Sequence, residues 1–188
     1  TVLNEDILKV DIRKIAEEKN GGKPIKVVAN LPYYITTPII MGLFEKHVPV
    51  KSITVMVQKE VAERLYAKPG TKDYGALSVW IQSYVRVEWG FVVGPGAFNP
   101  PPKVDSAVVT FIPLPRERHP ADPKALSSIL KLCFQLRRKQ LQSILRRAGR
   151  DDTAAALERL GIAPEARPET LTPEQFQQLA GIFGRSGC

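Results

Sequence analysis

The residues best suited to chemistry form the tetrapeptide Asn30-Leu31-Pro32-Tyr33, which follows a short apolar run from Ile25 to Ala29. The run predicts a buried strand. Pro32 lacks an amide hydrogen and favours an extended residue before it, so it ends the strand. A side-chain amide, main-chain carbonyls and an aromatic ring are thus expected at the carboxyl end of a strand, where open α/β sheets bind ligands.

This set of groups suits methyl transfer to the exocyclic amine of a planar base. The amine is a weak nucleophile because its lone pair is delocalised into the ring. Asn30 Oδ1 and the carbonyl of Leu31 or Pro32 can accept the amine's N–H bonds and turn the lone pair out of the ring plane. Tyr33 would stack on the base. A strand that ends in an ordinary turn explains the same residues, and the tetrapeptide alone leaves both interpretations open.

A second candidate stretch runs from Ala97 to Val109, as Ala-Phe-Asn-Pro-Pro-Pro-Lys-Val-Asp-Ser-Ala-Val-Val. It predicts a stiff, proline-rich turn that leads into a strand. Phe98 stands at the mouth of this turn. The prolines that follow it favour a ring held in an exposed position, whereas a core phenylalanine is the alternative.

With Asn30-Leu31-Pro32-Tyr33-Tyr34-Ile35-Thr36 and Gln58-Lys59-Glu60-Val61-Ala62, this stretch resembles the ribosomal RNA adenine dimethyltransferase family. More closely, it resembles the bacterial enzymes that dimethylate two adjacent adenines near the 3′ end of small-subunit rRNA. The three motifs occur in the family's order, and the resemblance covers the chain from Asn4 to about Ala148. It implies S-adenosylmethionine as the methyl donor, no metal, the pre-30S subunit as partner, a cytoplasmic location and a monomeric enzyme.

The resemblance also implies roles for single residues. Asn30 and the carbonyls of Leu31 and Pro32 would orient the amine. Tyr33 and Phe98 would clamp the adenine, which must leave its stack to be modified.

Asp6 occupies the position of a family acidic residue that contacts the cofactor's adenine, and Asn30 is expected to contact the cofactor as well. A loop aspartate or a helix N-cap explains Asp6 without the resemblance. The family's glycine-rich cofactor loop should lie upstream, and no such pattern stands between a strand and a helix in these 188 residues. We therefore expect the chain by itself to be inactive.

The expected fold is α/β, a Rossmann-like methyltransferase sheet followed by a small all-helical domain. Strands are expected from about Ile25, Ser52, Val85 and Ser106, and the resemblance makes them strands 4, 5, 6 and 7 in the spatial order 4-5-7-6. Residues 1–113 would belong to the catalytic domain and residues 114–188 to a helical rRNA-binding domain.

Thr1-Val2-Leu3 is expected to end an earlier strand. Residues 1–20 are expected to be displaced, mobile or borrowed by a neighbour, and the strand at Ile25 to be an exposed edge.

The chain is basic, with a formal net charge of +8 and a pI near 9.6, which favours polyanionic partners. Its two cysteines have no pairing or metal-ligand spacing, which fits a reducing cytosol, and no apolar run is long enough to span a membrane.

No acidic residue occurs from Pro123 to Arg150, so this stretch predicts a phosphate-tracking surface, with a solvated helix face as the alternative. With the resemblance, rRNA contacts are expected at Lys103, Arg137, Arg138, Lys139, Arg146 and Arg147.

The loop from Ala67 to Gly75 interleaves Lys, Gly and Tyr. Loops of this composition contact phosphates and stack on bases, and a solvated loop is the alternative.

Three rival functions remain. A DNA adenine methyltransferase shares the Asn/Asp-Pro-Pro-Tyr type of motif, but Leu31 favours the rRNA family. A large-subunit rRNA methyltransferase of the antibiotic-resistance type is disfavoured by the Pro-Pro-Pro-Lys-Val-Asp-Ser run. A non-catalytic ribosome-assembly or nucleic-acid-binding module of the same fold would be distinguished from an enzyme by cofactor binding.

Overall fold

The computed structural model describes residues 2–31, 36–45, 48–150 and 152–183. The chain divides into two compact units: unit 1 contains residues 1–62 and 85–113, and unit 2 contains residues 63–84 and 114–188. The chain therefore passes between units at residues 113 and 114, and residues 63–84, between the second and third strands, group with the helical residues. No helix in the described ranges combines the length and apolar character needed to cross a membrane.

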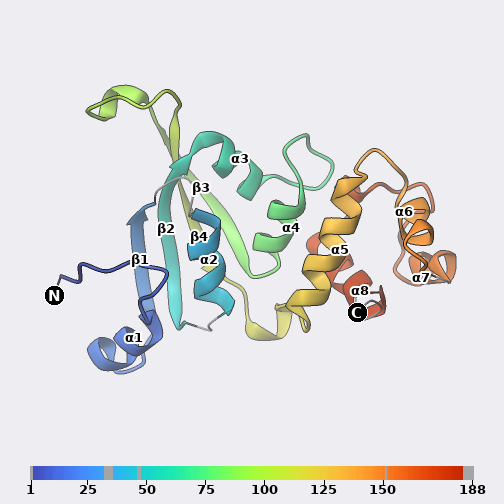
Figure 1. Cartoon of the computed structure of the whole chain (residues 1–188), viewed down its shortest axis with the longest axis horizontal. Helices are drawn as coiled ribbons and strands as arrows, with labels where there is room; N and C mark the ends of the chain where they lie inside the picture. Colours follow the sequence, from blue (N-terminus) through green and yellow to red (C-terminus); the bar gives the residue numbers. More distant parts are fainter. Residues whose placement is uncertain (1, 32–35, 46–47, 151, 184–188) are drawn as a thin grey trace. The chain divides into compact units, whose positions relative to one another are not determined.

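Unit 1 is built on a four-stranded sheet with the order β1-β2-β4-β3 (Figure 1). The strands are β1 (Ile25–Asn30), β2 (Val50–Gln58), β3 (Val85–Val93) and β4 (Ser106–Pro113). β1 and β2 run parallel, whereas β4 is antiparallel to both β2 and β3. The predicted order 4-5-7-6 is confirmed.

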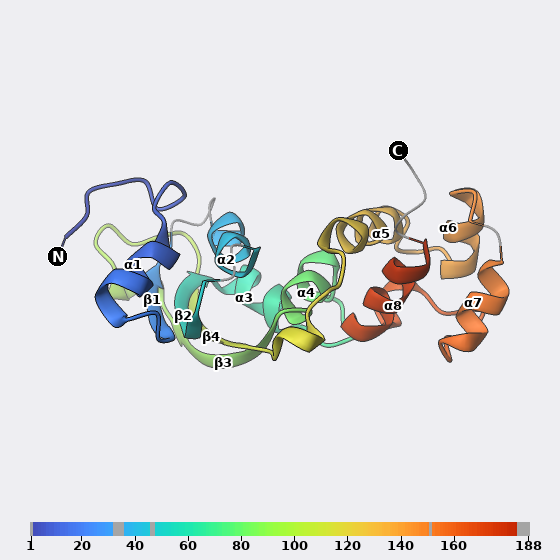
Figure 2. The same ribbon diagram turned by 90° about the horizontal axis from the view of Figure 1, so that it is seen from below.

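One face of the sheet is buried because apolar residues alternate along its two central strands. Helix α2 (Thr36–Glu45) covers one face of the sheet (Figure 2). A cross-strand hydrogen bond of 3.0 Å joins the hydroxyls of Thr54 and Thr110 on the two central strands. The buried apolar residues of β2, β4 and α2 are Ile53, Val55, Val57, Ala107, Val109, Phe111, Ile39, Ile40, Leu43 and Phe44.

Strand β1 lies at the edge of the sheet, and among the described residues its partner is β2. Lys26, Val28 and Asn30 are exposed, and the Val28 side chain is 80% exposed. The expectation of an exposed edge at this strand is confirmed.

One expectation for the first twenty residues is wrong. Val2 and Leu3 are exposed and form no strand, because a strand needs a neighbour to take up its backbone hydrogen bonds and none lies beside them in the described chain. Residues Ile12–Asn20 form helix α1, in which Ala16 is buried, and the expectation that residues 1–20 are displaced, mobile or borrowed by a neighbour stays a prediction. Its ends are set locally: Asp11 accepts from the Lys14 N–H, and Gly21 takes a left-handed conformation with φ of 58°.

Unit 2 is helical. Helix α3 (Lys59–Tyr66) crosses the boundary between the units, and short 3₁₀ turns occur at η1 (Pro95–Ala97) in unit 1 and at η2 (Arg116–Arg118) and η3 (Pro168–Thr170) in unit 2. The other helices are α4 (Ala76–Gln82), α5 (Pro123–Gln135), α6 (Leu141–Arg147), α7 (Thr153–Arg159) and α8 (Pro173–Phe183).

Helix α5 packs against α4 and α8, and α6 packs against α7. The helix ends follow from local chemistry. Asp122 accepts from the Ala125 N–H at the start of α5, and Thr172 and Gln175 form a reciprocal capping pair at the start of α8. Gly149, with φ of 68°, follows α6. The buried faces of α5 and α8 consist of Ala125, Leu126, Ile129, Leu130, Cys133, Pro173, Phe176, Leu179, Ala180 and Phe183.

Candidate active site

The carboxyl ends of β1 and β2 lie side by side, which places Asn30 next to the end of β2. Asn30 pairs with Met56 in parallel register, and the Leu31 N–H donates a long bond of 3.4 Å to the Met56 carbonyl. Asn30 is exposed, whereas Leu31 is buried. Burial of Leu31 therefore anchors the backbone while the Asn30 amide stays accessible to a substrate.

The proline-rich segment arrives at this same edge. β4 begins at Ser106, which lies opposite Gln58 at the end of β2 and opposite Val93 at the end of β3. Residues 94–105 therefore form a hairpin that projects from the edge where β1 and β2 end (Figure 1). The motif at residues 58–62 and the proline-rich motif at residues 97–109 meet here because β4 runs antiparallel to β2.

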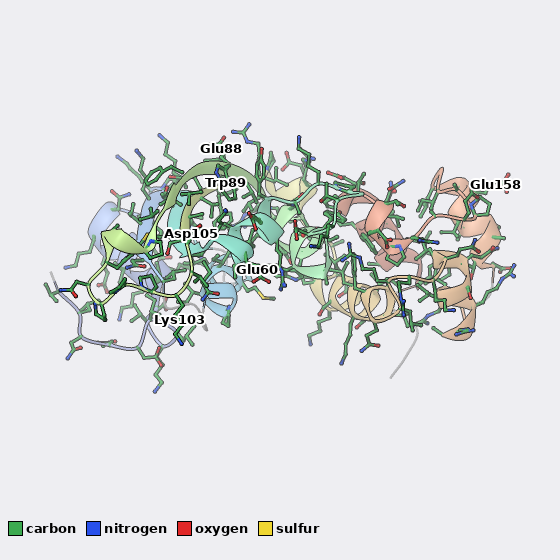
Figure 3. The ribbon with its side chains drawn as sticks, turned by 90° about the horizontal axis from the view of Figure 1, so that it is seen from above. Glu60, Glu88, Trp89, Lys103, Asp105 and Glu158 are labelled. Atoms are coloured by element: carbon green, nitrogen blue, oxygen red, sulfur yellow. The ribbon has the colours of Figure 1, made fainter. Side chains whose placement is uncertain are left out.

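Lys59 and Asp105 join these two motifs directly. The Lys59 N–H donates to the Asp105 carbonyl at 3.0 Å, and Lys59 Nζ lies 3.9 Å from Asp105 Oδ2. Neither residue was expected from the sequence to have a role of its own. The only indication was a pair of opposite charges, one directly after the strand expected from Ser52 and one directly before the strand expected from Ser106. Figure 3 labels Asp105 and Lys103 on the hairpin and Glu60 at the start of α3.

Phe98 lies in the hairpin immediately after η1, and its N–H donates to the Pro95 carbonyl at 3.1 Å. The Phe98 ring is half-buried, so it is held as expected but is less open than the prolines indicated. Lys103, on the opposite limb of the hairpin, is exposed. The roles of Phe98 on a base and of Lys103 on RNA stay predictions.

Asp6 is exposed, and its Oδ1 accepts from the Leu8 N–H at 3.0 Å. This is the local turn of a loop aspartate, which explains Asp6 without any ligand. Its cofactor contact stays a prediction. Pro32 and Tyr33 lie outside the described residues.

The predicted cationic residues of unit 2 lie directly after α5 and at the end of α6. Arg138, Lys139, Arg146 and Arg147 are exposed, the last two in the final turn of α6. Arg137 is half-buried, and its Nη2 donates to the carbonyls of Thr71 and Lys72 at 3.3 and 2.9 Å. These carbonyl bonds were not foreseen, because the sequence does not show which distant backbone an arginine meets.

Tyr74 cannot stack on a base as its loop suggested. Its side chain is fully buried, and its hydroxyl donates to the Leu171 carbonyl at 2.8 Å. Burial, with a smaller contribution from Glu174, raises the pKa of the Tyr74 hydroxyl. Tyr74 is therefore part of the packing of unit 2.

Cys133 is no nucleophile in this fold. It lies fully buried on α5, and burial raises the pKa of its thiol from 9.0 to about 12. Within the described ranges, no group of three or more His, Cys, Asp or Glu side chains is placed to hold a metal ion.

Solved structures with the same arrangement define the class of fold. A dimethyladenosine transferase from Plasmodium falciparum superposes with a TM-score of 0.74 at 28% identity, over 84% of this chain and 68% of that one. The 23S rRNA methyltransferase ErmE superposes with a TM-score of 0.59 at 24% identity, over 95% of this chain and 80% of that one. Unit 1 is a Rossmann-like methyltransferase sheet.

The sequence narrows this class to a family. Residues 1–184 match the ribosomal RNA adenine dimethylase family, and the chain belongs to it. Ribosomal RNA small subunit methyltransferase A of Lawsonia intracellularis is 47% identical over 187 residues, covering 97% of this chain and 69% of that protein. The protein of the same name from Lachnoclostridium phytofermentans is 51% identical over 191 residues, covering 97% and 65%. The chain spans about two thirds of the length of these curated relatives.

Proposed function

We propose that the chain carries the amine-orienting and RNA-docking parts of an S-adenosylmethionine-dependent enzyme that dimethylates N6 of two adjacent adenines near the 3′ end of small-subunit rRNA. Its substrate in ribosome biogenesis would be the pre-30S subunit, and the enzyme would act as a monomer. The observation that carries this proposal is the exposed Asn30 amide, set by buried Leu31 at the sheet edge from which the 94–105 hairpin projects.

In this proposal Asn30 Oδ1 and the carbonyls of Leu31 and Pro32 accept the N–H bonds of the adenine amine. These bonds hold the nitrogen lone pair out of the ring plane and stabilise the positive charge that develops during transfer. Tyr33 and Phe98 clamp the ring. Transfer then needs no covalent link to the protein.

When bound, S-adenosylmethionine supplies an electrophilic methyl group. The exposed carboxylate of Asp6 and the exposed amide of Asn30 have the acceptor chemistry that suits the amine groups of this cofactor. We propose that these two residues hold it only weakly, because the 188 residues contain no glycine-rich turn between a strand and a helix. Calorimetric titration should then show no tight binding of the cofactor to this chain, and tight binding would contradict the proposal.

Activity is tested in a chain extended with the N-terminal region of the Lachnoclostridium phytofermentans relative. Asn30→Ala should lower the single-turnover methylation rate far more than rRNA affinity, because the amide acts mainly on the transition state. Equal losses in rate and affinity would make Asn30 a binding residue only.

Transfer to small subunits but not to large subunits supports the proposed substrate. RNA binding without any transfer would favour a non-catalytic assembly module.

RNA docking is assigned to the exposed cations that follow α5 and end α6, namely Arg138, Lys139, Arg146 and Arg147. Replacing Arg138 and Lys139 together with Gln should weaken rRNA binding. Removing one phosphate contact should lower the slope of log K against log salt by roughly 0.7–0.9. An unchanged slope in titrations at several salt concentrations would make these side chains a solvated surface.

A further inference from the structure

The loop between α3 and α4, residues 67–75, is held at both ends of its exposed part by contacts with distant segments. The Gly70 N–H donates to the Glu169 carbonyl at 2.7 Å, and the Tyr74 hydroxyl donates to the Leu171 carbonyl at 2.8 Å. The Thr71 N–H and hydroxyl both return to the Lys68 carbonyl, at 3.1 and 2.7 Å. The loop has the composition of a nucleic-acid contact, but the proposed function does not use it.

Arg137 ties the middle of the 67–75 loop to the segment after α5. Its Nη2 donates to the carbonyls of Thr71 and Lys72, residues separated from it by 66 and 65 positions in the sequence. A planar guanidinium suits two acceptors of fixed geometry better than a lysine ammonium does. These bonds engage Nη2 and leave the Nε–H and the Nη1 amine to other acceptors.

This contact gathers positive charge from two parts of the sequence. Lys68 and Lys72 are exposed on the loop, and Arg138 and Lys139 are exposed directly after Arg137. The loop carries one acidic residue, Asp73, so its own charge remains positive. In Figure 1 the loop lies beside the end of α5, as the two Arg137 bonds require. The two Arg137 bonds thus bring the loop that carries Lys68 and Lys72 next to the segment that carries Arg138 and Lys139, within unit 2.

We propose that the 67–75 loop is a second phosphate-contacting element of the RNA-docking surface, with Lys68 and Lys72 binding phosphate oxygens of the RNA that Arg138 and Lys139 bind. Arg137 is the positioning residue that holds the loop for this contact. The inference rests on the proposed function and deepens it by extending the docking surface to a segment that precedes α5. Lysines suit this role because they bind phosphate as point charges without reading sequence.

The first test measures the salt dependence of binding between the full 188-residue chain and transcribed small-subunit rRNA. Changing Lys68 and Lys72 together to Gln should lower the slope of log K against log salt by roughly 1.4–1.8, since each phosphate contact contributes roughly 0.7–0.9. The matched control changes Lys9 and Lys23, two exposed lysines of unit 1, to Gln. It removes the same charge and should leave the slope unchanged.

The second test separates positioning from a direct contact by Arg137. If Arg137 positions the loop, the K68Q/K72Q change should have a smaller effect on the slope in an R137Q background than in the original chain. In an R138Q background its effect should be undiminished, because Arg138 contacts RNA on its own account. Hydrogen exchange at the Gly70 amide should accelerate in R137Q and not in R138Q.

The outcomes separate this inference from the proposed function. An unchanged slope in K68Q/K72Q together with a lowered slope in R138Q overturns the loop contact and leaves the docking surface in place. Unchanged slopes in both variants overturn both. Full additivity between R137Q and K68Q/K72Q overturns the positioning role of Arg137.

Discussion

Gly90 is the residue of β3 at which a side chain has no room. Trp89 pairs with Val109 and Val92 pairs with Ala107, so Gly90 and Phe91 both lie opposite Val108 in a bulge. A Cβ placed on Gly90 would stand 2.7 Å from the Val108 carbonyl oxygen and 3.5 Å from its Cγ1. We predict that Gly90→Ala destabilises the sheet and displaces the 94–105 hairpin.

The size of the effect follows from the nature of the clash. Ordinary van der Waals contact begins at 3.4 Å, and the atom in the way belongs to the β4 backbone, which cannot rotate aside as a flexible side chain would. Forced overpacking of this kind typically costs about 1–3 kcal/mol. For a chain of this size each kcal/mol lowers Tm by roughly 2–4 °C. Gly90→Ala should therefore lower Tm by roughly 2–12 °C.

Thermal unfolding followed by circular dichroism measures this change. The matched control is Gly96→Ala in the 94–105 hairpin, where an added Cβ meets no atom within 4 Å. It should change stability by no more than about 0.5 kcal/mol. Equal Tm values for the two variants would refute the steric argument, because both replace a glycine by alanine and differ in the space around the new methyl group.

Two further changes test the packing of unit 2. Tyr74→Phe keeps the ring but removes the donor to the buried Leu171 carbonyl, so urea unfolding should show a loss of about 1–3 kcal/mol, and an unchanged midpoint would contradict the assigned bond. Alkaline pH should also destabilise the fold, because the thiol of Cys133 has a higher pKa in the folded chain, about 12, than its ordinary value of 9.0. The stability that this shift contributes is fully present below pH 9.0 and is lost as the pH rises towards about 12. Cys133→Ala should lose less stability than the original chain between about pH 8 and pH 11, and equal losses would show that the thiol does not contribute.

Elements with a strong local pattern could be predicted from the sequence. The alternation of Ile53, Val55 and Val57 identifies β2 because a strand with one buried face repeats every two residues. Thr172 and Pro173 mark the start of α8 because a cap is made within one turn of the helix. The Asn30-Leu31-Pro32-Tyr33 motif predicted orientation of an amine from its residue types, and that role stays a prediction.

The sequence could not predict contacts made across long separations. Tyr74 and Leu171 lie 97 positions apart, and Arg137 meets the Thr71 carbonyl across 66 positions. A tyrosine in a polar loop predicts base stacking, but packing buries the ring of Tyr74. An arginine beside other cations predicts phosphate binding, but Arg137 donates to a distant backbone carbonyl. Composition and periodicity describe neighbours along the chain and carry no information on such partners.

The sequence by itself thus determined the kinds of secondary structure, their caps and the residues able to orient an amine, because these depend on a few neighbouring positions. The tertiary structure decided which of those residues meet. The antiparallel entry of β4 brings the 94–105 hairpin to the edge that carries Asn30. The same packing of distant segments buries Tyr74 and bonds Arg137 to the 67–75 loop. Burial and hydrogen-bond partners are properties of the folded chain as a whole, since each requires a surface that another part of the sequence supplies.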